Sequence, residues 1–202
     1  ILGLKKANRF IRGFDRPNLS YHTIECKNKI EKVAEILRNT KQGSSIIYCG
    51  SRKRVDEISF QLGKLGFAAA GYHAGLPTES RKIIQDDFIK GEKNVIVATN
   101  AFGMGIDKAD VRNVIHCDYT ATLEAYYQEA GRAGRDRHPS DCYLLHSAAD
   151  YHLQDYFISC RYPEREDVER VFGALMHYAD ANGIVRLSNT LLGNSTGIPE
   201  IK

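Results

Sequence analysis

The stretch SIIYCGSRKR, residues 45–54, decides the fold because it joins an apolar run directly to the start of a helical pattern. Residues 45–49 are nearly all apolar and rich in β-branched and aromatic side chains, which favours a buried strand. After Arg54 an apolar stripe at helical spacing runs on to Gly66, which ends the pattern. The stripe consists of Val55, Ile58, Leu62 and Leu65. The stretch therefore predicts a buried strand followed at once by a helix.

The same alternation of strand and helix continues on both sides of this stretch. A helical stripe at residues 30–37 precedes it and stops before Gly43. Further strands are predicted at residues 68–72, 95–98, 111–117 and 142–145, and further helices at residues 78–90 and 123–133. Apolar strands separated by helices predict an α/β fold with a parallel sheet covered on both faces. Ligands of such sheets lie beyond the carboxyl ends of the strands, so chemistry is expected after Cys49, Tyr72 and Ala98.

Both ends of the chain differ from this central pattern. Residues 1–18 have no sustained period and end in a turn signal, DRPN, so they are predicted to form a linker leading into an α/β domain at residues 19–147. From residue 148 to 202 two helical patterns replace the alternation, one around Leu153 and one opened by Pro163 and closed by Asn182-Gly183. The stretch from Leu191 has no clear period. A small, truncated helical appendage is therefore expected at residues 148–202.

The composition is that of a soluble globular domain, with 43% hydrophobic and 26% charged residues. No apolar run could span a bilayer, and residues 1–14 lack the apolar core of a signal peptide, so a cytoplasmic or nuclear protein without a membrane partner is expected. The net charge of +3 permits nucleic-acid binding without arguing for it. The five cysteines are widely spaced and odd in number, which favours reduced thiols over disulfides or a zinc site.

Two arginines three positions apart, Arg132 and Arg135, stand in the stretch QEAGRAGRD, residues 128–136. Side chains at this spacing project in nearly the same direction from a helix, and the small residues around them allow phosphates to approach closely. A guanidinium stays charged and stabilises charge that develops on transferred phosphate oxygens. Taken alone, the motif more often marks a basic helix end that complements the helix dipole.

The loop after residue 98 carries further candidates. Thr99 offers a hydroxyl to a phosphate, and Asp107 can accept a hydrogen bond from a ribose or an arginine. Gly103 and Gly105 free the backbone to approach a ligand closely. Taken alone, the loop also fits a plain turn in which Asp107 caps local backbone groups.

Two other strand ends carry polar residues. Ser51 can cap the helix that starts at residue 52, and the basic residues 52–54 favour an anion at that helix terminus. His73 and Gly75 follow the next strand along the chain. A solvated basic first turn and a hydrogen-bonded structural histidine are the alternative interpretations.

Together and in this order, the stretches resemble the second-lobe motifs of superfamily two helicases. The sequences ATNAFGMGIDK at residues 98–108 and YYQEAGRAGRD at residues 126–136 are similar to motifs of the RecQ family. FDRPNL at residues 14–19 resembles the segment that leads into the second lobe in that family. The resemblance covers about residues 14–150. It implies a RecA-like three-layer fold and the second motor lobe of an ATP-dependent DNA helicase, which unwinds DNA in the 3′ to 5′ direction in recombination and repair.

The resemblance also implies roles for single residues. Arg135 would be the arginine finger that reaches the γ-phosphate, with Arg132 beside it and Gln128 helping to sense the nucleotide. Gly103, Gly105 and Asp107 would border the nucleotide. The residues expected near the backbone of the tracked DNA strand are Ser51, Arg52, His73, Gly75 and Thr99.

Half of the expected site is missing from the sequence. It has no G-x-x-x-x-G-K-[ST] phosphate loop and no acidic quartet after a strand, so ATP and Mg²⁺ are expected to be held mainly by a first lobe of the same polypeptide, without which this chain is inactive. Ala109 replaces the family's usual proline, and Arg137 and His138 replace its usual glycine. Only Cys160 falls where RecQ proteins have a four-cysteine zinc module, so no zinc is predicted.

Two other classes of function remain open. One is a nucleic-acid-binding module that keeps the fold without motor function, which loss of the finger positions would favour. The other is a nucleotide-binding regulator or protein-interaction domain, which would dimerise or bind a partner without ATP or DNA.

Overall fold

The computed structural model describes residues 15–103, 106–151 and 163–198. The chain divides into two compact units, with the boundary between Ser147 and Ala148. Each unit is described by itself.

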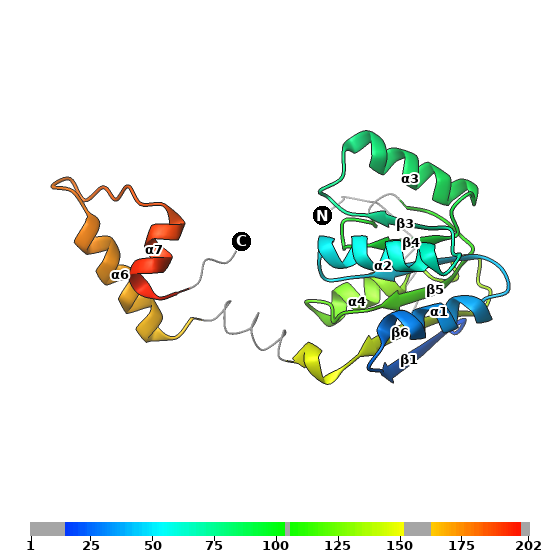
Figure 1. The fold of residues 1–202 in the computed structure, drawn as a ribbon. Helices are drawn as coiled ribbons and strands as arrows, with labels where there is room; N and C mark the ends of the chain where they lie inside the picture. The colour runs from blue at the N-terminus through cyan, green and yellow to red at the C-terminus, as the bar shows by residue number, and fades with distance from the viewer. Residues whose placement is uncertain (1–14, 104–105, 152–162, 199–202) are drawn as a thin grey trace, which may run out of the picture. The chain divides into compact units, whose positions relative to one another are not determined.

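The first unit is built on a parallel sheet. Its six strands are ordered β1-β6-β5-β2-β4-β3 (Figure 1), and every neighbouring pair is parallel. The strands are β1 (Leu19–Glu25), β2 (Ser44–Tyr48), β3 (Ala69–Tyr72), β4 (Val95–Ala98), β5 (Val111–His116) and β6 (Ser140–His146). The helices are α1 (Lys29–Asn39), α2 (Arg52–Lys64), α3 (Thr78–Lys90) and α4 (Leu123–Ala130).

Helices cover both faces of this sheet because the central strands are apolar on both sides. On one face, Ile47 and its neighbours pack against α1 and α2, which lie in front of the strands in Figure 1. On the other face, Ile46 and its neighbours pack against Phe88 of α3 and Ala130 of α4. The prediction of a three-layer α/β fold with a parallel sheet is confirmed.

Two central elements agree residue for residue with their predictions, α3 at 78–90 and β4 at 95–98. The helix predicted at 123–133 ends earlier, at Ala130, because residues 131–136 form a succession of turns. Strand β1 was not predicted. It is an edge strand whose residues are mostly exposed or half-buried, so it lacks the apolar run that marks the central strands.

The lead-in segment differs from a plain linker where it is described. Arg16 and Asn18 donate side-chain hydrogen bonds to backbone carbonyls of residues 131–138, more than a hundred positions along the chain. This end of the segment is therefore packed against the rest of the first unit.

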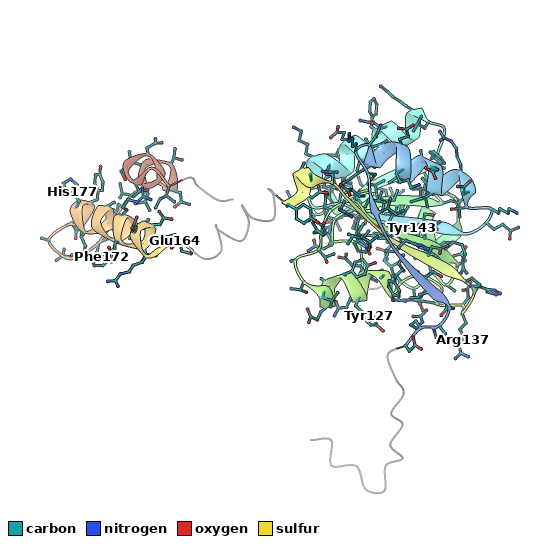
Figure 2. All side chains as sticks on the ribbon, turned by 90° about the horizontal axis from the view of Figure 1, so that it is seen from below. Tyr127, Arg137, Tyr143, Glu164, Phe172 and His177 are labelled. Carbon is teal, nitrogen blue, oxygen red and sulfur yellow. The ribbon has the colours of Figure 1, made fainter. Side chains whose placement is uncertain are left out.

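The second unit contains α6 (Arg165–Tyr178) and α7 (Asn189–Thr196). The apolar stripe predicted on α6 is present, but no residue of this helix is buried, and Figure 2 shows Phe172 on it. Helix α6 ends at Tyr178, before the predicted stop at Asn182-Gly183, and α7 occupies part of the stretch from Leu191 that showed no period. The helix predicted around Leu153 lies outside the described residues. In the described ranges, no helix is long and apolar enough to cross a membrane.

Candidate nucleotide and nucleic-acid site

Four loops follow neighbouring strands at the carboxyl edge of the sheet, those after β2, β3, β4 and β5. The loop after β2 leads straight into α2, whose N-terminus is capped by Ser51, since its Oγ accepts from the backbone N–H of Arg54 at 3.3 Å. Ser51, Arg52 and Lys53 are exposed. A helix N-terminus with exposed cations beside it attracts an anion.

His73 and Gly75 form a compact pair after β3. The Nδ1 atom of His73 accepts from the backbone N–H of Gly75 at 3.1 Å, so Nε2 carries the ring proton and donates to Asp56 Oδ1 at 3.1 Å. His73 is buried. A Cβ atom at Gly75 would lie 3.0 Å from His73 Nδ1 and 3.3 Å from Arg52 Cδ, so Arg52, His73 and Gly75 meet at one place.

Asp118, which the sequence analysis did not single out, braces this edge from the end of β5. One carboxylate oxygen accepts from the backbone N–H of Gly50 at 2.8 Å, and the other lies 3.2 Å from Arg54 Nη1. The buried Lys29 ammonium lies 3.8 Å from the same carboxylate. An acid directly after a predicted buried strand was the available signal. Asp118 fixes the loop that presents Ser51 and Arg52.

The loop after β4 starts at this edge and crosses the α3–α4 face of the sheet. The backbone N–H of Thr99 donates to Tyr72 O at 3.2 Å, which places Thr99 beside the end of β3. Farther along, Phe102 and Ile106 are buried in the core of that face. This one loop thus connects the carboxyl edge to the arginine pair.

Arg132 lies against the buried Gly103. Its Nη1 atom donates to Gly103 O at 2.5 Å, and a Cβ atom at position 103 would collide with the guanidinium, with Cζ only 2.9 Å away. The Nε atom of Arg132 is buried and has no partner among the described residues. A larger residue at position 103 would force the Arg132 guanidinium to move from this place.

Arg135 is paired with Asp107. Its Nη1 atom donates to Asp107 Oδ1 at 2.7 Å and to Ile106 O at 3.2 Å. The Arg135 side chain is 36% exposed and that of Asp107 is 86% exposed, so the pair lies at the surface. Asp107 therefore holds the guanidinium in one direction while leaving it open to solvent.

The turn that carries both arginines, residues 131–136, is called the arginine turn below. It lies near the amino ends of the strands, because Gly134 N–H donates to the O atom of Val111, the first residue of β5. Arg112 holds the last residue of the arginine turn, Asp136, since its Nη2 atom donates to Asp136 Oδ2 at 2.5 Å. This hydrogen bond lowers the pKa of Asp136. Figure 2 shows Tyr127, which projects outward from α4, and the exposed Arg137 just beyond the turn.

A buried polar group lies beneath these loops. His116, fully buried, shares a hydrogen bond of 2.8 Å between its Nε2 and Glu129 Oε2 and stacks on Tyr48. The Tyr48 hydroxyl donates to Phe102 O at 2.9 Å, and burial raises the pKa of this hydroxyl well above its usual value, so it remains a donor. Through these three side chains, β2, β5 and α4 are joined to Phe102, the residue before Gly103.

The helicase conserved C-terminal domain family matches residues 28–137, more than half of the chain. The chain belongs to this family. The RecQ helicases are similar to it: ATP-dependent DNA helicase RecQ of Haemophilus influenzae is 40% identical over 188 residues, which cover 92% of this chain and 30% of that protein. RecQ of Bacillus subtilis is 41% identical over 157 residues, with 78% and 27% covered. The predicted resemblance to a RecQ second lobe is confirmed, and the chain spans less than a third of the length of these relatives.

Solved structures show the same fold. The C-terminal domain of the DEAD-box protein Dbp5 has a TM-score of 0.58 and 25% identity, covering 69% of this chain and 86% of that one. A Dbp5 variant from S. cerevisiae has a TM-score of 0.62 and 23% identity, covering 73% of this chain and 40% of that one. The RecA-like fold of this helicase lobe is therefore confirmed.

The structure sorts the predicted site residues of this helicase lobe into two groups. The first lies at the carboxyl edge and consists of Ser51, Arg52, His73, Gly75 and Thr99. The second lies on the α3–α4 face and consists of Gly103, Asp107, Arg132 and Arg135. Gln128 is exposed on α4 and has no described contact to either group. Gly105 lies outside the described residues.

Proposed function

We propose that this chain is the second motor lobe of an ATP-dependent DNA helicase that unwinds DNA in the 3′ to 5′ direction and serves recombination and repair. The RecQ relatives are ATP-dependent DNA helicases by name, which supports ATP dependence and action on DNA. The observation that carries the proposal is the anchored arginine pair: Arg132 and Arg135 are both held by the loop that starts at Thr99.

The two guanidiniums fit a nucleotide phosphate. Both described hydrogen bonds of Arg135 start at Nη1 and its side chain is 36% exposed, so Nη2 and Nε remain for an anion. The Nε atom of Arg132 lacks a partner in the described part of the chain but is buried, so this side chain has to shift before the atom can reach a phosphate. Arg135 is the proposed finger, Arg132 its neighbour and Gln128 the nucleotide sensor, and Gly103, Gly105 and Asp107 are proposed to border the nucleotide. A finger acts by stabilising charge in the transition state, so its loss costs about 10³–10⁵ in rate.

The carboxyl edge is the proposed contact to DNA. Ser51, Arg52, His73, Gly75 and Thr99 offer a helix N-terminus, a cation, a hydroxyl and close backbone approach. Such groups recognise phosphate and sugar without reading bases, which suits a motor that must step along any sequence. Thr99 and Asp107 belong to the same connection between β4 and β5, so the proposed DNA and nucleotide contacts lie on one segment.

A first lobe of the same polypeptide is the proposed holder of ATP and Mg²⁺, and this chain alone, which supplies half of the site, is proposed to be inactive. The proposed domain limits are residues 19–147 for the motor lobe and 148–202 for the helical appendage, with residues 1–18 leading in. The protein is proposed to work in the cytoplasm of a bacterium or the nucleus of a eukaryote.

The proposal is tested by DNA-stimulated ATP hydrolysis of the full-length protein carrying Arg135→Ala. We expect kcat to fall by about 10³-fold or more while ATP binding is kept, because the finger acts in the transition state. Arg38→Ala is the matched control, since Arg38 is an exposed arginine on α1. In parallel, Arg52→Ala should weaken binding of single-stranded DNA and make it less dependent on salt, whereas Lys64→Ala at the other end of α2 should not.

Unchanged hydrolysis in Arg135→Ala would refute the finger assignment. If the chain then still binds single-stranded DNA through Arg52, a nucleic-acid-binding module without motor function becomes the better account.

A further inference from the structure

We infer that Arg16 and Asn18, which precede β1, are positioning residues that hold the arginine turn in the orientation its side chains need. The inference rests on the function proposed for Arg132 and Arg135. It concerns a clamp between segments far apart in sequence, since 115 positions separate Arg16 from its first acceptor, Gly131.

Arg16 makes three hydrogen bonds to the arginine turn. Its Nη1 atom donates to Gly131 O at 3.4 Å, and its Nη2 atom donates to Ala133 O at 3.0 Å and to Gly134 O at 2.8 Å. The first of these acceptors, Gly131, is the C-cap of α4, and a cation beside a helix C-terminus complements the helix dipole. The last turn of α4 has no basic residue of its own. Arg16 supplies the missing cation from another segment.

Asn18 fixes the other side of the turn. Its Nδ2 atom donates to Gly134 O at 2.9 Å and to His138 O at 3.0 Å, and its own carbonyl accepts from Ser140 N–H at 2.9 Å. Gly134 has a φ of +54°, a left-handed conformation that turns the chain between the two arginines. Gly134 O is thus bonded by both Arg16 and Asn18, at the point where the backbone changes direction.

These contacts act on the arginines through the backbone. The clamped carbonyls belong to the residues on either side of Arg132 and to the residue before Arg135. Because the direction of a side chain follows from the backbone at its own residue, holding these peptide groups sets where both guanidiniums point. Gly103 and Asp107 then fix only the far ends of the side chains. Neither Arg16 nor Asn18 is proposed to touch the nucleotide.

The test is steady-state ATP hydrolysis by the full-length protein with Arg16→Met, which keeps the aliphatic stem and removes the donors. We expect kcat to fall roughly 10- to 100-fold, because a small misplacement of a group that acts in the transition state is costly, while KM for ATP and DNA affinity change little. Arg16→Lys, which can still bond one carbonyl, should recover part of the loss. Arg38→Met is the matched control.

A second readout does not depend on activity. In the isolated chain, the side-chain N–H signals of Arg132 and Arg135 in a nitrogen-15 NMR spectrum should shift or broaden in Arg16→Met and stay in place in Arg38→Met. Asn18→Ala loses two neutral hydrogen bonds and should lower kcat less, roughly 3- to 10-fold. It keeps the inference testable if Arg16→Met folds poorly.

The outcomes separate this inference from the proposed function. If Arg135→Ala abolishes hydrolysis while Arg16→Met and Asn18→Ala leave kcat unchanged, the positioning role is refuted and the motor assignment stands. If Arg135→Ala leaves hydrolysis unchanged, the proposed function fails and the positioning role falls with it. An equal loss of kcat in Arg16→Met and Arg38→Met would also overturn the clamp.

Discussion

Replacing Gly134 by alanine should destabilise the first unit by about 3–4 kcal/mol, against about 1–2 kcal/mol for the same change at Gly66. Both glycines have a positive φ, +54° and +86°, so both substitutions strain the backbone. They differ in their surroundings. A Cβ atom at Gly134 would lie 2.7 Å from Ser140 Oγ and 2.8 Å from His138 O, and closer still to Asn18 Nδ2, whereas Gly66 has open space.

The magnitude follows from the bonds that must give way. A left-handed backbone costs an ordinary residue about 1–2 kcal/mol, and Gly66, whose φ of +86° lies farther from the left-handed minimum than the +54° of Gly134, is strained at least as much. At Gly134 the displaced side chains also lose three neutral hydrogen bonds, two from Asn18 and one from Ser140 Oγ to His138 O. Each contributes about 0.5–1.5 kcal/mol, and their partial exposure favours the lower half of that range. The sum adds about 2 kcal/mol.

The assay is urea unfolding followed by near-ultraviolet circular dichroism. The chain has no tryptophan, so the strongest signal comes from tyrosines, of which Tyr48 and Tyr72 are buried in the first unit. The midpoint should shift further for Gly134→Ala than for Gly66→Ala at an unchanged denaturant slope. Equal midpoints for the two variants would show that the hydrogen bonds around Gly134 contribute nothing to the free energy of unfolding, which would refute the prediction.

Three further predictions concern the core, the ion pair and pH. Phe88→Ala should lower the free energy of unfolding by about 3–5 kcal/mol, because Phe88 is fully buried. Ile83→Ala, on the exposed side of the same helix, should lower it by about 1 kcal/mol or less in the same urea titration. Similar losses for the two variants would show that burial of Phe88 does not stabilise the core. Asp107→Asn should change the free energy of unfolding by less than about 1 kcal/mol, because the ion pair with Arg135 is exposed. The same substitution should lower kcat of the full-length protein. An unchanged kcat would show that Asp107 does not orient the finger. Burial raises the pKa of the Cys142 thiol from 9.0 to about 12, so the thiol loses its proton at lower pH in the unfolded chain than in the folded one. The free energy of unfolding should therefore fall as pH rises through that window. Cys142→Ala should show a shallower alkaline fall, and a pH profile identical to that of the unsubstituted protein would contradict the role of this thiol.

The periodicity of side chains along the chain was enough to predict the central part of the fold. The predicted helix at 78–90 and the predicted strand at 95–98 agree with α3 and β4, because buried apolar strands and one-sided helices leave a strong local pattern. The order of the short motifs was enough to predict the RecQ resemblance. It also drew attention to Arg132 and Arg135, whose role awaits the hydrolysis experiment.

Only the tertiary structure decided which of these residues meet. Strand β1 lies at the sheet edge and has no strong pattern, so its pairing with β6 had no local signal. The partners of the arginines, Gly103 for Arg132 and Asp107 for Arg135, are 28 or 29 positions away. The clamp by Arg16 depends on contacts more than a hundred positions apart. Periodicity reports which face of an element is buried, whereas the pairing of distant polar groups arises only when the sheet order brings their segments together.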